Sequence, residues 1–171
     1  ASLRAAMRED PDIIQVGEMR DLETMQLAMT AAETGHLVLG TMPTTNAART
    51  IDRIIDSFPP AQQPQVRIML SESLKGIISQ KLIPTKDGKQ VPAVEIIVST
   101  PSLAHLVRDQ KTFKIPSVVQ TSRHLGMQTL EDSLLALYKE GIITDQETRL
   151  AANDQVVIEE MLAGKTVEYK D

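Results

Sequence analysis

Near the start of the chain runs the stretch Arg8-Glu9-Asp10-Pro11-Asp12-Ile13-Ile14-Gln15-Val16-Gly17-Glu18-Met19-Arg20-Asp21. Pro11 fixes its own φ and has no backbone N–H to donate, so it ends any element before it. The β-branched apolar residues that follow are typical of a short strand buried on both faces of a parallel sheet. We therefore expect a strand that begins just after Pro11 and ends at Gly17.

Glu18 follows this strand directly, where a parallel strand would leave the sheet at its carboxyl edge. Ligands of open α/β sheets bind at that edge. A carboxylate held there can orient a water molecule or support a Mg²⁺ ion beside a nucleotide phosphate. On spacing alone, a solvated loop explains Glu18 and Arg20 about equally well, because charged strand-to-helix loops are common.

Residues 7–21 resemble the signature of the secretion-superfamily ATPases, the hexameric motors of type II secretion and type IV pili. That signature reads apolar-Arg-x-x-Pro-Asp, an apolar strand, then Gly-Glu-apolar-Arg-Asp, and it forms an atypical Walker B motif. The resemblance implies a catalytic role for Glu18 and nucleotide-binding positions at Gly17, Arg20 and Thr41. Gln15 departs from the apolar pattern, so either it faces a polar neighbour or the strand is less buried than usual.

Length and composition exclude several classes of protein. The 171 residues suffice for one domain or one and a half with a real core. The net charge of −5 argues against a general nucleic-acid surface, which needs a basic footprint. The absence of cysteine excludes a disulfide framework and is consistent with a cytosolic protein. No apolar run reaches the roughly 18 residues of a membrane span, and the first residues are no signal peptide. We expect a soluble protein without membrane insertion.

Strand and helix patterns alternate in the first part of the chain. Apolar spacing predicts a helix over Asp21–Thr34, with Asp21 as its N-cap. A second short strand is expected over His36–Thr41, and a helix follows from a cap at Thr44 or Thr45 to Phe58. Such short strand–helix–strand alternation predicts a βαβ unit with a parallel sheet. A further short helix is expected at Ala1–Arg8.

Helical and hairpin patterns follow. Gln62–Gln80 has the apolar spacing of a helix, and Asp87-Gly88 between apolar runs predicts a β-hairpin with strands at Gln80–Pro84 and Val91–Val98. Beyond it, caps and apolar stripes predict only helices, ending in an amphipathic tail from Gln155 that either docks or frays. We expect one domain over residues 1–98 and a helical domain over residues 99–171.

The stretch Ala32-Glu33-Thr34-Gly35-His36-Leu37, followed by Gly40-Thr41, resembles the His box of the same family. It implies that His36, which starts the strand beside that of Glu18, contacts a phosphate or the catalytic water. As a lone residue, His36 would more often be a structural histidine. The family has a second histidine in the loop after Gly40-Thr41, where this chain has Pro43, so any contact made by that histidine is absent or supplied elsewhere.

Arg53 and Asp56 also match the family. Their simpler interpretation is a solvated helix face with intrahelical ion pairs, each worth a few tenths of a kcal/mol.

The second half of the chain resembles the pilus-retraction branch (PilT and PilU) of the family, chiefly over Leu125–Leu130 and residues 100–109. Assembly and type II secretion motors usually carry a tetracysteine zinc insertion, and this chain has no cysteine. The implied fold is α/β: the C-terminal half of a RecA-like P-loop NTPase sheet with a β-hairpin, followed by a small all-α domain. No Gly-x-x-x-x-Gly-Lys-Ser/Thr phosphate loop occurs. We therefore expect the C-terminal half of a longer protein and no ATP hydrolysis by residues 1–171 alone.

The resemblance implies part of a motor that hydrolyses ATP with Mg²⁺ to retract a type IV pilus. It also implies a homo-hexamer, or a hetero-oligomer with a paralogous motor, that meets an inner-membrane platform protein. The expected location is cytoplasmic, peripheral to the inner membrane at the pilus base. Two alternatives stay open: an assembly or type II secretion motor, and a catalytically idle partner subunit, which Pro43 and Gln15 favour.

Overall fold

The computed structural model describes residues 5, 9, 11–165 and 167 of the chain. The helix expected at Ala1–Arg8 falls almost wholly outside these residues. The chain folds into two compact units, which we describe separately. The first unit comprises Ala1–Thr44, Ala48–Lys75 and Pro101–Thr112, and the second comprises Thr45–Ala47, Gly76–Thr100 and Phe113–Asp171.

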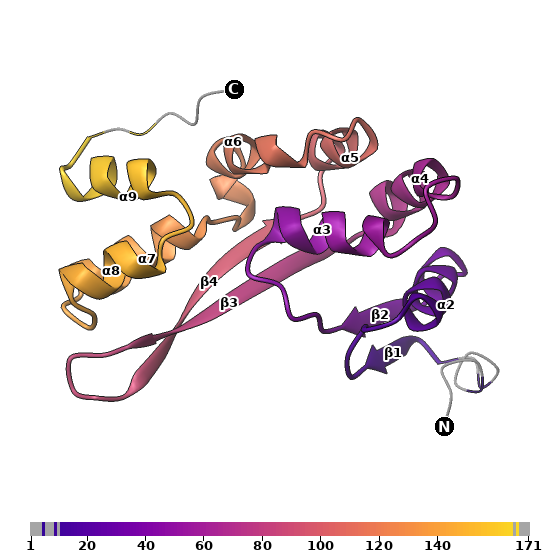
Figure 1. The fold of residues 1–171 in the computed structure, drawn as a ribbon, viewed down its shortest axis with the longest axis horizontal. Coiled ribbons are helices and arrows are strands. Elements are labelled where there is room, and N and C mark those ends of the chain that lie inside the picture. Colours follow the sequence, from indigo (N-terminus) through magenta and orange to yellow (C-terminus); the bar gives the residue numbers. More distant parts are fainter. Residues whose placement is uncertain (1–4, 6–8, 10, 166, 168–171) are drawn as a thin grey trace. The chain divides into compact units, whose positions relative to one another are not determined.

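The first unit contains the expected βαβ arrangement (Figure 1). Its elements are β1 (Ile13–Val16), α2 (Leu22–Glu33), β2 (Leu37–Gly40), most of α3 (Ala47–Asp56), α4 (Gln63–Ser73) and α5 (Pro101–Arg108). Strands β1 and β2 are parallel, with Ile13 opposite Leu37 and Val16 opposite Gly40. The α/β fold class predicted from the sequence is thus confirmed.

Helix α2 begins and ends where local chemistry predicts. The side chain of Asp21 accepts a hydrogen bond from the backbone N–H of Thr24 at 2.8 Å, which satisfies one of the free donors at the helix start. Gly35 follows the helix with φ of 101°, a left-handed conformation that glycine adopts at low cost. The buried face of α2 consists of Met25, Ala28, Met29 and Ala31.

Burial of β1 differs from the expectation. Ile14 is buried, whereas Ile13 on the opposite face is 58% exposed, and Leu37 and Leu39 of β2 are also exposed. Within the described residues this sheet has only two strands, so one face packs on the unit and the other faces solvent. The prediction of burial on both faces is therefore wrong for this chain. Gln15 is exposed too, which agrees with the alternative that this strand is less buried than usual.

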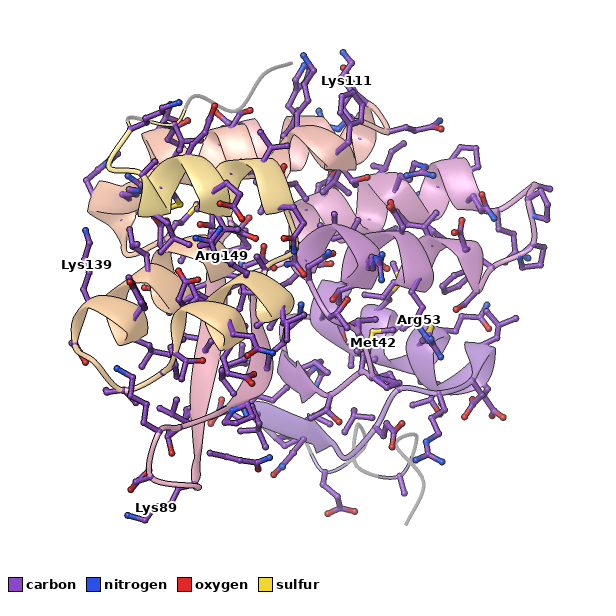
Figure 2. All side chains as sticks on the ribbon, turned by 60° about the vertical axis from the view of Figure 1, so that its left-hand side comes forward. Met42, Arg53, Lys89, Lys111, Lys139 and Arg149 are labelled. Atoms are coloured by element: carbon purple, nitrogen blue, oxygen red, sulfur yellow. The ribbon has the colours of Figure 1, made fainter. Side chains whose placement is uncertain are left out.

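The second unit is built on an antiparallel hairpin of β3 (Gly76–Pro84) and β4 (Gln90–Val98). The turn lies at the predicted place, with Gly88 at φ of 80° and a 2.9 Å hydrogen bond from the N–H of Thr85 to the carbonyl of Lys89. Lys89 lies at the solvated tip of the hairpin (Figure 2).

The helix predicted over Gln62–Gln80 is too long, because α4 ends at Ser73 and β3 already begins at Gly76. A Cβ at Gly76 would lie 2.8 Å from the carbonyl oxygen of Ile97 on β4, so the close approach of the two strands requires glycine there. The apolar residues around Gly76 suit both a helix and a strand. The contact between Gly76 and Ile97 joins residues far apart in the sequence, so a local pattern cannot reveal it.

The remaining elements of the second unit are helical. They are η2 (Thr112–Lys114, shared with the first unit), α6 (Ile115–Thr121), η3 (Arg123–Leu125), α7 (Leu130–Lys139), α8 (Asp145–Ala151) and α9 (Gln155–Leu162). Thr129 and Asp132 form a capping box at the start of α7. Ile158 of α9 is fully buried in a core with Ile83, Ala93, Leu130, Leu134 and Ile143. The tail helix therefore docks rather than frays.

The two compact units do not follow a single boundary between residues 98 and 99. The hairpin packs on α7 and α8, whereas α5, beyond that boundary, packs on α4. Sequence order and packing partner differ here because β3 and β4 bury one apolar face against helices that come later in the chain. Among the described helices, none is both long and apolar enough to cross a membrane.

Candidate functional site

The candidate site lies at the carboxyl edge of β1 and β2. After Gly17, the chain places the side chain of Glu18 one third exposed, with Oε1 at 2.6 Å from Nε of Arg20. The hydrogen bond from Arg20 lowers the pKa of Glu18 below its ordinary value, and the positive charges of Arg20 and Arg53 act in the same direction. Glu18 is therefore an ionised carboxylate near neutral pH, suited to orient water or a hydrated cation.

Thr41 closes the same edge from the neighbouring strand. Its backbone carbonyl accepts a 2.9 Å hydrogen bond from the N–H of Met19, and its hydroxyl donates to the carbonyl of Gly17. Gly40 allows this approach, because a Cβ there would lie 2.8 Å from Cε of Met19. The structure thus brings together four of the five predicted site residues: Gly17, Glu18, Arg20 and Thr41.

His36 is the fifth predicted site residue, and the structure does not place it in this group. It precedes β2 at the amino end of the sheet, where the N–H of Leu37 donates to the carbonyl of Asp12 at 3.0 Å. Its Nδ1 lies 3.0 Å from the carbonyl oxygen of Ala31 and 3.1 Å from the hydroxyl of Thr34. These contacts tie the ring of His36 to the end of α2, as its interpretation as a structural histidine predicts. That His36 contacts a phosphate or the catalytic water stays a prediction.

Arg53 lies on the solvated helix face that the simpler interpretation of the sequence predicts. Both Arg53 and Asp56 are exposed on α3. The side chain of Arg53 is labelled in Figure 2. The charge of Arg53 nevertheless reaches Glu18 and lowers the pKa of that carboxyl group, less than Arg20 does. Its match to the family pattern is the signal that points to such a role.

The donors at this edge fit one side of a nucleotide–Mg²⁺ site. Among the described residues, no group of three or more His, Cys, Asp or Glu side chains could hold a metal ion. Mg²⁺ beside phosphates typically needs only one or two protein carboxylates and keeps several waters, which the single carboxylate of Glu18 satisfies. The 171 residues contain no phosphate-loop motif to cradle the phosphates. The fold and this edge define an α/β protein with a carboxylate at the carboxyl edge of its parallel strands, where ligands of this fold class bind.

Comparisons with known proteins agree with this class. A family model described as "Type II/IV secretion system protein" matches residues 1–127. The chain is 54% identical over 148 residues to the "Type IV pilus retractation ATPase PilT" of Pseudomonas aeruginosa, covering 86% of this chain and 43% of PilT. It is 51% identical over 154 residues to a "Twitching motility protein" of Neisseria gonorrhoeae, covering 90% of this chain and 41% of that protein.

A solved structure is similar as well. The crystal structure of the pilus retraction motor PilT with bound ADP matches with a TM-score of 0.84 and 48% identity, covering 93% of this chain and 45% of that one. The chain belongs to the type II/IV secretion system protein family. It spans less than half the length of each of these three relatives.

Proposed function

We propose that this chain supplies the Walker B-type edge of an ATP-driven motor that retracts type IV pili. One observation carries the proposal: Gly17 and Met19, the residues on either side of Glu18, are both hydrogen-bonded to Thr41 at the carboxyl edge of two parallel strands. The 54% identity to a protein named as a pilus retraction ATPase supports this particular motor.

Each residue at the edge has a proposed role. Glu18, an ionised carboxylate paired with Arg20, orients the water that attacks the terminal phosphate or a water bound to the metal. Arg20 holds the carboxylate in place through their 2.6 Å contact. Thr41 and Gly17 fix the backbone from which Glu18 projects. Mg²⁺, when bound with ATP, neutralises charge on the phosphate oxygens.

The wider assembly follows from the resemblance. We propose a RecA-like core over residues 1–98 and a helical domain over residues 99–171 within a hexamer, homomeric or shared with a paralogous motor. The hexamer works on the cytoplasmic side of the inner membrane and meets the pilus platform protein. Residues 1–171 alone do not hydrolyse ATP, because their sequence offers no phosphate loop for the β- and γ-phosphates.

A chimera tests the proposal. The 148 residues of P. aeruginosa PilT that match this chain are replaced by those of this chain, and the product is expressed in a strain from which PilT has been deleted. We expect this PilT chimera to restore twitching motility. A soluble chimera that hydrolyses ATP but leaves the cells non-motile would contradict retraction.

Pro43 favours a second candidate, a catalytically idle partner subunit. It is exposed in the loop that follows Thr41 and has no N–H to donate to a ligand. An idle subunit would leave the PilT chimera without ATP hydrolysis, and replacing Glu18 with glutamine would then change nothing. Turnover by the chimera that depends on Glu18 would exclude this candidate.

A further inference from the structure

The register of β1 and β2 predicts which residue should bond to the carbonyl of Thr41. Ile13 lies opposite Leu37, and the N–H of Leu37 donates to the carbonyl of Asp12 at 3.0 Å. Parallel strands repeat such bonds evenly, once every two residues along each strand. If this pattern continued past the end of β1, the N–H of Glu18 would donate to the carbonyl of Thr41.

The observed donor is Met19, one residue later, at 2.9 Å from the carbonyl of Thr41. The side chain of Met19 shows the same shift. Val16 lies opposite Gly40 on one face of the pair, and strand residues alternate between faces, so residue 18 would be the next on that face. Instead, Cε, Sδ and Cγ of Met19 lie within 3.2 Å of the place that a Cβ on Gly40 would occupy. The end of β1 therefore contains one extra residue, a bulge at Glu18.

The bulge determines how Glu18 stands at the carboxyl edge. In a regular strand, Glu18 would take the place over Gly40 where the thioether of Met19 now lies. The extra residue gives that place to the apolar side chain and leaves the carboxylate of Glu18 one third exposed, in contact with Arg20. Bulges beside active sites commonly redirect a side chain in this way.

The missing side chain of Gly40 serves the same contact. Gly40 does not have a left-handed φ, so its backbone conformation would suit other residues. What excludes a side chain is space, because a Cβ would lie 2.8 Å from Cε of Met19. Glycine at position 40 therefore provides the seat in which the side chain of Met19 lies.

We propose that Met19 is a positioning residue for Glu18: its side chain, seated on Gly40, holds the bulge from which the carboxylate leaves the sheet. All three residues belong to the first compact unit. The effect of Met19 on catalysis rests on the proposed function, whereas the bulge itself does not.

The first experiment measures amide hydrogen exchange in the wild-type 171-residue chain. After correction for intrinsic rates, we expect the amide of Met19 to exchange about fivefold more slowly than that of Glu18, the factor that a typical net hydrogen bond gives. The amide of Leu37, bonded to Asp12 at the other end, is the internal reference. A protected amide at Glu18 beside an unprotected one at Met19 would mean a regular strand and would overturn the proposal.

The second experiment tests the seat. In Gly40→Ala the flexible side chain of Met19 can move away, so we expect a small change in Tm but at least about threefold faster exchange at Met19 relative to Leu37. Met19→Ala should have a similar effect at residue 19, and the double variant should add nothing, because both changes remove one contact. Met25→Leu, at a buried methionine of α2, is the control and should leave the ratio unchanged. Unchanged exchange in folded Gly40→Ala, or additive effects, would refute the seat.

The third experiment measures ATP hydrolysis by the PilT chimera. Met19→Ala and Gly40→Ala should each lower kcat by about tenfold with little change in KM, because the carboxylate of Glu18 is misplaced. Met19→Leu, which keeps an apolar side chain over Gly40, should retain most of kcat, and Met25→Leu should leave both constants near wild type. Wild-type kcat in folded Met19→Ala and Gly40→Ala chimeras would overturn the positioning role. If the unmodified chimera hydrolyses no ATP, the proposed function fails, and the exchange measurements alone decide whether Met19 holds the bulge.

Discussion

His36 and Glu18 lie at opposite ends of the parallel pair β1–β2. The backbone beside His36 is bonded to Asp12 at the amino end, whereas Glu18 follows Val16 at the carboxyl end. The first and last paired residues of these strands are three residues apart, at a rise of roughly 3.3 Å each. The side chains of His36 and Glu18 lie beyond opposite ends of the pair, and are therefore more than about 10 Å apart. Two residues on neighbouring strands share a site only when both lie at the same edge.

Replacing His36 tests its structural role. We predict that His36→Ala lowers the free energy of unfolding of the 171-residue chain by about 1 kcal/mol, because the hydrogen bond to the end of α2 is lost. Urea unfolding measures this change. In the PilT chimera, the same substitution should leave kcat within about threefold of wild type, a change of under ~1 kcal/mol in the barrier. A hundredfold loss of kcat in a folded chimera would instead support the contact with a phosphate or the catalytic water that the family resemblance implies.

Arg20 lowers the pKa of Glu18 through their hydrogen bond. We predict that Arg20→Gln raises the pKa of Glu18 towards 4.5, because the largest cause of its lowered value is removed. A lowered acid pKa adds stability above the unfolded value that is lost as pH falls through the folded value. For this exposed pair, however, solvent makes any gain small. Carboxyl carbon NMR of the 171-residue chain follows the titration. Arg149→Gln, which removes the partner of Asp145 instead, is the control and should leave Glu18 unchanged.

Glu95 should make the stability of the chain depend on pH in the opposite direction from Glu18. Because burial raises its pKa in the folded chain, the native state binds more protons than the unfolded state above about pH 4.5. Its contribution to stability is fully present below that pH and is lost as pH rises through the raised value. We predict that, as pH rises from 4.5, the Tm of wild type falls relative to the Tm of Glu95→Gln. A difference that grows in favour of wild type would contradict this sign.

Gly76 marks the start of β3, and its replacement tests the close strand contact. We predict that Gly76→Ala lowers the free energy of unfolding by about 1–3 kcal/mol, because its Cβ would press on the backbone of Ile97 at 2.8 Å. Gly17→Ala is the control, since a Cβ at Gly17 meets no atom within 4 Å. Chemical unfolding of both variants measures the difference. Equal stability of the two variants would show that the strands can separate without cost.

Local chemistry explains what could be predicted from the sequence. Asp21 and Thr129 cap helices through atoms three residues away, and Gly88 turns a hairpin within four residues, so short patterns contain the whole interaction. The edge that joins Gly17, Glu18 and Thr41 was predictable for a related reason. Two parallel strands in sequence must end on the same side, and the family signature marked the residues at that end.

Contacts between residues far apart in the sequence explain where the structure differs from the predictions. The start of β3 depends on Ile97, and the N–H of Ala47 at the start of α3 donates to Glu95, 48 residues further along the chain, so neither contact leaves a local pattern. The exposure of Ile13 depends on how many strands and helices cover the sheet, which an apolar run does not reveal. The fold of this chain does not decide the role of His36 that the family motif implies, because His36 precedes β2 at the amino end of the sheet.

The most direct test is the rate of ATP hydrolysis by the PilT chimera with and without the carboxylate of Glu18. Glu18→Gln keeps the size of the side chain and removes its charge. Glu72→Gln, an exposed change on α4, is the matched control. We predict that Glu18→Gln lowers kcat at least about a hundredfold, the scale of a lost acid–base group, while Glu72→Gln stays within about twofold. A folded Glu18→Gln chimera that hydrolyses ATP at the wild-type rate would contradict the account.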